Sequence, residues 1–150
     1  MNGTIVERIR RNARVCVDSM TFIYFIEAHQ QYLPVVRDLF WMIDQGMINA
    51  FSSYLTLLEV LVQPLKENRV DLVNEYKSIL LGASGFQLLP INGDIAERGA
   101  EIRARYGFRT PDALQLATAL CNGAGAFVTN DTRLRRFREL EVVLLEDFVV

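Results

Sequence analysis

Residues 110–131, TPDALQLATALCNGAGAFVTND, indicate the fold more clearly than any other part of the chain. The pair Thr110-Pro111 is typical of the first turn of a helix, and the pair Asn122-Gly123 is typical of a helix end. The apolar run 126–128 then predicts a short buried strand, and Asp131 follows it closely. This stretch therefore predicts a helix, a tight turn, a strand and an acidic residue just beyond the strand.

The same alternation of strands and helices extends outward in both directions. Ser19 is expected to cap one helix and Ser52 or Ser53 another, while Pro64 either kinks the second helix or opens the next element. Short, continuous apolar strands between helices predict a parallel sheet covered on both faces. The other expected strands are 14–17, 48–51, 86–91 and 142–145, and the other expected helices are 20–28, 34–45, 53–62, 70–81, 94–106 and 132–140.

Composition favours one domain over residues 1–150. The chain is 51% hydrophobic and 23% charged, which is enough apolar material for a core in a chain of this length. No repeat or flexible linker divides it. No apolar run is long enough to span a bilayer, and the basic, polar residues 1–14 lack the apolar core of a signal peptide. We therefore expect a cytoplasmic protein without a membrane partner.

The chain has 2 cysteines and 1 histidine, too few for a zinc site of cysteine and histidine. Cys16 lies in an apolar run and Cys121 near a helix end, so both are expected to be buried thiols. Any bound metal would therefore be held by oxygen atoms.

Two acidic residues follow predicted strands. Asp18 comes directly after the run 15–17, and Asp131 comes soon after 126–128. In parallel sheets the ligand site forms at the carboxyl ends of the strands, so these two carboxylates should lie near it. For either residue alone, a role in a turn or a helix cap is the simpler interpretation.

Two further acids lie in helices. Glu59 has apolar neighbours nearly all round its helix, which should therefore be largely buried, although an exposed stripe is the alternative. Asp112 lies in a first helical turn, where an acid also offsets the helix dipole. Considered together, the four carboxylates are suitable ligands for magnesium or manganese, which would lower the pKa of a bound water and neutralise charge on a phosphodiester.

The residues around these acids resemble the four motifs of PIN-domain proteins, and more narrowly the VapC-type toxins of toxin–antitoxin pairs. The third and fourth motifs, residues 106–120 and 126–131, are the most specific pair, and all four occur in the family's order. The resemblance covers the chain from Arg14 onward. The motifs are Val15-Cys-Val-Asp18-Ser-Met-Thr-Phe-Ile, Ser53-Tyr-Leu-Thr-Leu-Leu-Glu59-Val-Leu, Tyr106-Gly-Phe-Arg-Thr-Pro-Asp-Ala-Leu-Gln-Leu-Ala-Thr-Ala-Leu120 and Ala126-Phe-Val-Thr-Asn-Asp131.

This resemblance implies a three-layer α/β/α fold and a metal-dependent endoribonuclease, commonly acting on tRNA or rRNA, that uses a metal-activated water. It also implies a homodimer and a cognate antitoxin. The catalytic and metal-binding residues carried over are Asp18, Glu59, Asp112 and Asp131, with Mg²⁺ or Mn²⁺ as cofactor. The supporting polar residues are Ser19, Thr129 and Asn130.

The net charge of −2 does not favour nucleic-acid binding by the chain as a whole. Three arginines near the fourth acid partly offset the unfavourable net charge, because they should lie on the face where the strands end. The predicted RNA contacts are Arg133, Arg135 and Arg136, which would bind phosphates independently of sequence.

Two other classes of function compete with the nuclease. One is a non-catalytic module of the same fold that binds RNA or protein. The other is a phosphoacceptor or phosphatase domain, which also gathers aspartates at strand ends but needs a nearby lysine and a paired acid after the first strand. The chain offers only Lys66 and Lys77, both in predicted helices, and Asp18 has no acidic neighbour.

Overall fold

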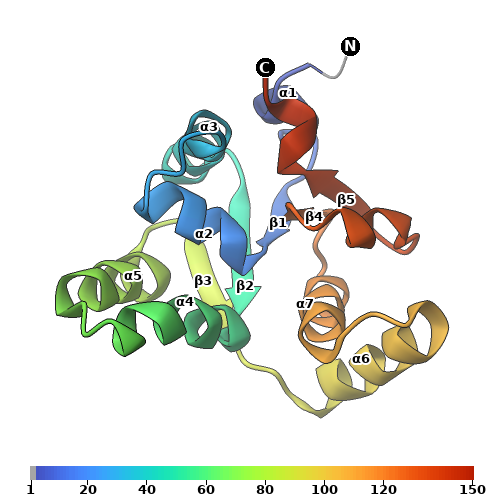
Figure 1. Cartoon of the computed structure of the whole chain (residues 1–150). Helices are drawn as coiled ribbons and strands as arrows, with labels where there is room; N and C mark the ends of the chain where they lie inside the picture. The colour runs from blue at the N-terminus through green and yellow to red at the C-terminus, as the bar shows by residue number, and fades with distance from the viewer. Residues whose placement is uncertain (1–2) are drawn as a thin grey trace.

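Five short strands form one parallel sheet at the centre of the computed structural model, which describes residues 3–150 (Figure 1). The first two residues of the basic N-terminal stretch lie outside the described residues. The order across the sheet is β3-β2-β1-β4-β5, and every neighbouring pair is parallel, as predicted. The strands are β1 (Arg14–Val17), β2 (Asn49–Ser53), β3 (Phe86–Leu89), β4 (Ala126–Thr129) and β5 (Glu141–Leu144).

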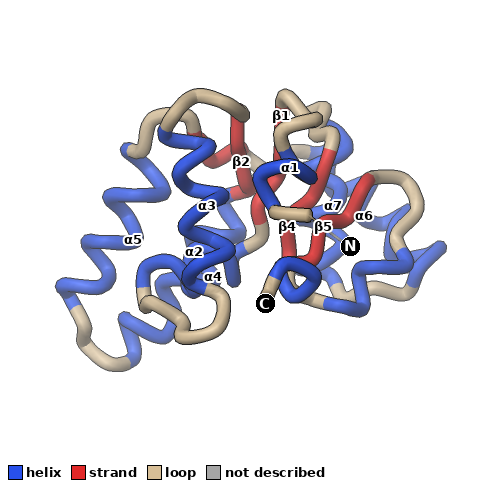
Figure 2. Tube along the Cα trace, turned by 90° about the horizontal axis from the view of Figure 1, so that it is seen from above, coloured by secondary structure: helices blue, strands red, loops and turns tan. Residues whose placement is uncertain are grey.

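Helices cover both faces of the sheet, so the three-layer α/β/α prediction is confirmed. Figures 1 and 2 show helices on both sides of the sheet. Successive residues of β1 point to opposite faces: Val15 and Val17 enter the first core, and Cys16 enters the second. The first face carries α2 (Ser19–Ile26), α3 (Leu33–Asp44), α4 (Tyr54–Lys66) and α5 (Val70–Gly82); the second carries α6 (Gly93–Tyr106) and α7 (Thr110–Cys121).

The register brings the ends of the central strands together. Cys16 of β1 pairs with Phe51 of β2 and with Phe127 of β4. Asp18 therefore follows the middle strand at the same edge of the sheet where β4 ends, and its backbone N–H donates to the carbonyl of Val128. This edge is where a parallel sheet forms its ligand site.

One helix was not predicted, α1 (Ile5–Ile9). The Thr4 hydroxyl accepts from the backbone N–H of Glu7, and the Glu7 carboxylate accepts from the backbone N–H of Thr4. This is a capping box, and its Thr-x-x-Glu spacing is visible in the sequence. Ile5 and Ile9 are buried, so the basic N-terminal stretch also contributes to the core.

Three local predictions are wrong. Asp18, not Ser19, caps α2. The basic helix expected over 132–140 is only the short 3₁₀ helix η1 (Thr132–Arg136), because Leu134 and Phe137 both bury their side chains and the chain then extends toward β5. Cys121 is exposed at the end of α7, while Cys16 is buried as expected. A second 3₁₀ helix, η2 (Leu145–Phe148), closes the described chain.

The helix that carries Glu59 is less buried than expected. It continues through Pro64 to Lys66, so Pro64 lies inside α4 and opens no new element. Leu58, Val62 and Leu65 are largely exposed on its outer side. The helix therefore presents both a buried face and an apolar solvent-facing stripe.

Among residues 3–150, no helix combines the length and the apolar character needed to cross a membrane.

Candidate functional site

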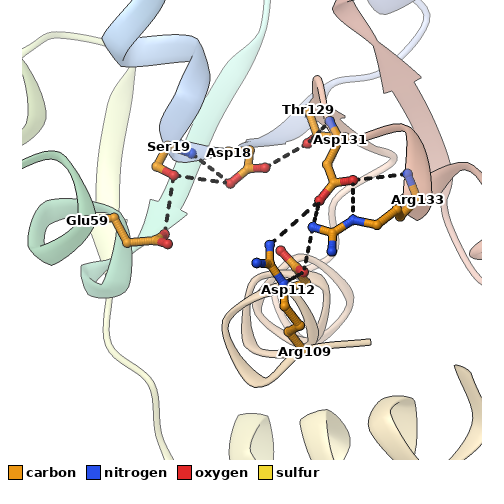
Figure 3. Close-up of polar contacts among 8 residues, drawn as sticks. All are labelled: Asp18, Ser19, Glu59, Arg109, Asp112, Thr129, Asp131 and Arg133. Atoms are coloured by element: carbon orange, nitrogen blue, oxygen red, sulfur yellow. Dashed lines mark hydrogen bonds and ion pairs between the residues drawn. The ribbon is translucent and has the colours of Figure 1, made fainter. Parts of the chain in front are cut away.

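The four predicted acids line one cavity of about 440 Å³ at the carboxyl edge of the sheet. They come from four segments far apart in the sequence: Asp18 after β1, Glu59 on α4, Asp112 on α7 and Asp131 after β4. Figure 3 shows Asp18 between Glu59 at the left and the pair Asp112 and Asp131 at the right, and all four acids line this acidic cavity.

Asp18 occupies the middle of the site because β1 is the central strand. One carboxylate oxygen accepts from the backbone N–H of Ser19 at 2.8 Å, and the other accepts from the Thr129 hydroxyl at 2.7 Å. Burial raises the pKa of the Asp18 carboxyl above its usual range, and these hydrogen bonds only partly oppose that rise. The carboxylate is held rigidly in an environment that disfavours its charge.

Glu59 approaches the same point from α4. The Ser19 hydroxyl lies 3.3 Å from a Glu59 carboxylate oxygen and 3.5 Å from an Asp18 oxygen, so it bridges the two acids. Burial raises the pKa of Glu59 as well, and the nearby charge of Asp18 adds to the rise. This half of the cavity therefore carries excess negative charge.

The other half is neutralised by two arginines. Arg109 Nε lies 3.2 Å from Asp112 Oδ2, and Arg133 makes a two-pronged contact with Asp131 (Figure 3). The hydrogen bonds from Arg133 hold the pKa of Asp131 below its usual range. Arg133 also lies 3.8 Å from Asp112, so the two arginines and two aspartates form one ionic cluster.

A buried polar network beneath the cavity connects the two acid-bearing helices. Gln115 of α7 accepts from the Ser53 hydroxyl and donates to the Thr56 hydroxyl of α4, both at 2.8 Å. The Thr56 hydroxyl also pairs with Ser52 at 2.6 Å. All four side chains are buried, so this network fixes the position of Asp112 on α7 relative to Glu59 on α4.

Replacing Gln115 by leucine is expected to lower the free energy of unfolding by about 1–3 kcal/mol, because the buried hydroxyls of Ser53 and Thr56 lose a partner. Urea denaturation monitored by circular dichroism measures this loss. The matched control is Gln63→Leu on the exposed side of α4, which should change stability by less than about 0.5 kcal/mol. Equal stability for the two variants would show that the network contributes little.

The donor set suits a hard divalent cation, since oxygen ligands are what magnesium and manganese prefer. Among the described residues, the lysine and arginine ion pairs include neither Asp18 nor Glu59, so that side of the cavity has no bound cationic side chain. Within residues 3–150, however, no three acidic, histidine or cysteine side chains are arranged to hold a metal as they stand. The four acids line one cavity, but two of them are engaged by arginine.

The other predicted site residues are dispersed around this cavity. The Thr129 hydroxyl donates a hydrogen bond to Asp18 and accepts one from the backbone N–H of Asp131. Asn130 lines the cavity, and its side-chain amide donates to the Tyr24 hydroxyl. Of the predicted RNA contacts, Arg135 is paired with Asp147 and Glu146 on η2. Arg136 instead lies with its guanidinium 4.4 Å from the centre of the Phe108 ring.

Sequence reasoning missed Arg109, Gln115 and Tyr24 as residues of this cavity. A polar Gln115 among the apolar residues of α7, one turn after Asp112, was a usable signal. Arg109 gave none, because an arginine before a helix is ordinarily a solvated charge. Neither Lys66 nor Lys77 lines the cavity, which removes the lysine that a phosphoacceptor site would need.

Comparison with known proteins places this geometry in context. The sequence model of one family, the PIN domain, matches residues 15–140. A comparison with curated protein sequences gives no match.

Three solved structures illustrate the fold that this chain shares. A toxin–antitoxin complex from Klebsiella pneumoniae is 23% identical with a TM-score of 0.65, covering 87% of this chain and 97% of that one. VapBC2 from Rickettsia felis, bound to a DNA fragment from its promoter, is 14% identical with a TM-score of 0.68, covering 87% and 98%. FitAcB from Neisseria gonorrhoeae is 19% identical with a TM-score of 0.68, covering 88% and 98%.

Proposed function

Because this chain belongs to the PIN-domain family, we propose that it is a metal-dependent endoribonuclease and the toxin of a type II toxin–antitoxin pair. The observation that carries the proposal is the meeting of Asp18, Glu59, Asp112 and Asp131 in one cavity at the carboxyl edge of the sheet. The reaction is hydrolysis of an RNA phosphodiester bond by water, so the protein supplies no nucleophile of its own.

Mg²⁺ or Mn²⁺ would be held by Asp18, Glu59 and Asp112, with Asp131 completing the site. When bound, such an ion lowers the pKa of a coordinated water and offsets the negative charge that builds on the phosphate. Ser19 and Thr129 keep Asp18 oriented for this task, because their hydrogen bonds fix both carboxylate oxygens.

Arg109 and Arg133 have a second task in this proposal. In the structure they neutralise Asp112 and Asp131. If these aspartates bind a metal instead, the two guanidiniums are released at the rim of the cavity, where the substrate phosphate would lie. Arginine suits this exchange, since its planar donor fork matches the oxygen geometry of both carboxylate and phosphate.

Two apolar surfaces support the proposed protein partners. A cavity of about 430 Å³ between α2, α3 and α5 is lined by aromatic side chains, including Trp41, which is 52% exposed. We assign this surface to the antitoxin. The exposed stripe on α4 is assigned to a homodimer, because adjoining apolar side chains on a helix exterior are typical of an interface; it consists of Tyr54, Leu58, Val62 and Leu65.

The test is cleavage of total RNA by the purified chain in Mg²⁺, in Mn²⁺ and in excess EDTA, beside an Asp112→Asn variant. We expect cleavage that needs a divalent ion and falls by about a hundredfold or more in the variant, because a ligand of the ion that stabilises transition-state charge is lost. Cleavage that survives in EDTA, or in Asp112→Asn at the same rate, would contradict the metal mechanism.

One observation favours a second candidate, a non-catalytic module that binds RNA or protein. The described residues hold no ready group of three metal ligands, and arginines already neutralise two of the acids. Under this alternative the same assay gives no cleavage in any metal, and added Mn²⁺ does not stabilise the fold.

A further inference from the structure

A second cavity, of about 640 Å³, adjoins the acidic cavity and is lined largely by arginine. Its size lies within the range of ligand-binding pockets. One acid, Asp112, also lines it. We call this cavity the arginine pocket; its five arginines are Arg109, Arg133, Arg135, Arg136 and Arg138.

The two cavities share a wall. Arg109, Asp112 and Thr132 line both of them. A chain-like ligand that reaches the acids is therefore separated from the arginine pocket only by these shared residues.

Three of the five arginines are already neutralised. Arg109 pairs with Asp112, Arg133 with Asp131, and Arg135 with the acids of η2. Within residues 3–150, no carboxylate lies within ion-pair distance of Arg136 or Arg138. The pocket thus holds two uncompensated positive charges on a chain whose net charge is −2.

One of these charges is held in a fixed position. The Arg136 guanidinium lies over the Phe108 ring, 4.4 Å from its centre, and donates a hydrogen bond to the Tyr106 carbonyl. Phe108 in turn packs beside Tyr106 and Phe137. An arginine fixed on a ring loses less freedom on binding, and its remaining N–H groups are available for an anion.

We infer that the arginine pocket binds the phosphate backbone of a single-stranded RNA segment next to the cleaved bond, through Arg136 and Arg138. The inference rests on the proposed function, because it assigns the continuation of the same substrate. The volume of about 640 Å³ suits a short segment of one strand. An acidic peptide would also satisfy the charges, but the shared wall with the acidic cavity favours the substrate of that cavity.

The experiment measures binding without cleavage. Fluorescence anisotropy in EDTA follows a labelled oligouridylate of about 12 nucleotides, within the site sizes of single-strand binding proteins. Arg138→Gln and Arg136→Gln are compared with the wild type across a salt titration. The matched control is Arg69→Gln, which removes one positive charge at the start of α5, far from the pocket in the chain and paired with Asp71.

Each pocket variant is expected to lower the slope of log affinity against log salt by about 0.7, the value for one phosphate contact on a single strand. At about 0.1 M salt this corresponds to about fivefold weaker binding per arginine. Arg69→Gln should change neither quantity. Arg136→Lys keeps the charge and should retain most of the affinity. If Arg136→Gln fails to fold because it leaves the Phe108 ring uncovered, Arg138→Gln alone carries the test.

Wild-type affinity and salt slope in both glutamine variants would overturn the inference. So would binding of a polyglutamate peptide that depends on Arg136 and Arg138 when oligouridylate does not bind. Because the assay contains EDTA, it is independent of catalysis. If the variants bind RNA more weakly but the wild-type chain cleaves no RNA, the assignment of the pocket is supported and the proposed nuclease activity is contradicted. If the wild-type chain cleaves RNA but the variants bind normally, the nuclease is supported and the assignment of the arginine pocket is wrong.

Discussion

Asp18→Asn is expected to lose RNA cleavage by at least about a hundredfold while the protein remains folded. Asp18 lies after the central strand, and both of its carboxylate oxygens are fixed by the protein, so no other acid can take its position. Losses of this size follow removal of a single stabiliser of transition-state charge, and here the variant would lose a ligand of the ion that has this role. The measurement is the initial rate of cleavage in saturating Mn²⁺, with Asp38→Asn, an exposed acid on α3, as the matched control.

The stability of Asp18→Asn provides the check on folding. Burial raises the folded-state pKa of Asp18 above its unfolded value, so its charged form destabilises the fold at neutral pH. That penalty is complete above the folded-state pKa and vanishes below about pH 4, where the carboxyl is protonated in both states. In EDTA the variant should therefore unfold at a higher denaturant concentration than the wild type at pH 7, and the difference should shrink toward pH 4. A variant that is inactive because it is unfolded would show the opposite.

The layered fold was predictable because its signals are local. The runs 15–17 and 126–128 are short, apolar and bounded by helix signals, and these features alone specify buried parallel strands. The order β3-β2-β1-β4-β5 was not predicted, since the neighbour of each strand depends on contacts between distant segments. The helix expected over 132–140 failed for the same reason: burial of Phe137 and pairing of β5 with β4 override the helical pattern.

That the four acids gather in one cavity was predictable from motif order and from the rule that ligands bind at strand ends. The division of the cavity into a half with unpaired acids and a half with arginine-paired acids was not predictable. Nothing in the sequence shows that Arg109 and Arg133 neutralise Asp112 and Asp131 while Asp18 and Glu59 share only the hydroxyl of Ser19. An arginine two or three residues from an acid is compatible with many geometries, and only the tertiary structure selects the one in which both guanidiniums enter the acidic cavity.

The division of charge leads to the second large expected effect, stabilisation of the fold by Mn²⁺. An ion that binds only the folded chain stabilises it by about 2.7 kcal/mol at one hundred times its dissociation constant. For a chain of this size each kcal/mol raises Tm by about 2–4 °C, so we expect an increase of about 5–10 °C. Differential scanning fluorimetry in EDTA and in increasing Mn²⁺ measures it. The increase should be lost in Asp18→Asn and retained in Asp38→Asn.

A third variant separates the metal site from general binding of cations to an acidic surface. The Arg133 guanidinium forms an ion pair with the Asp131 carboxylate, so a metal that binds this carboxylate must displace the guanidinium. Arg133→Gln should then lower the apo-protein Tm slightly but reach half of the Mn²⁺-induced increase at a lower metal concentration. If Arg133→Gln leaves the midpoint unchanged, Asp131 is not a ligand. If no variant alters the increase, Mn²⁺ binds elsewhere, and the four acids are not its site.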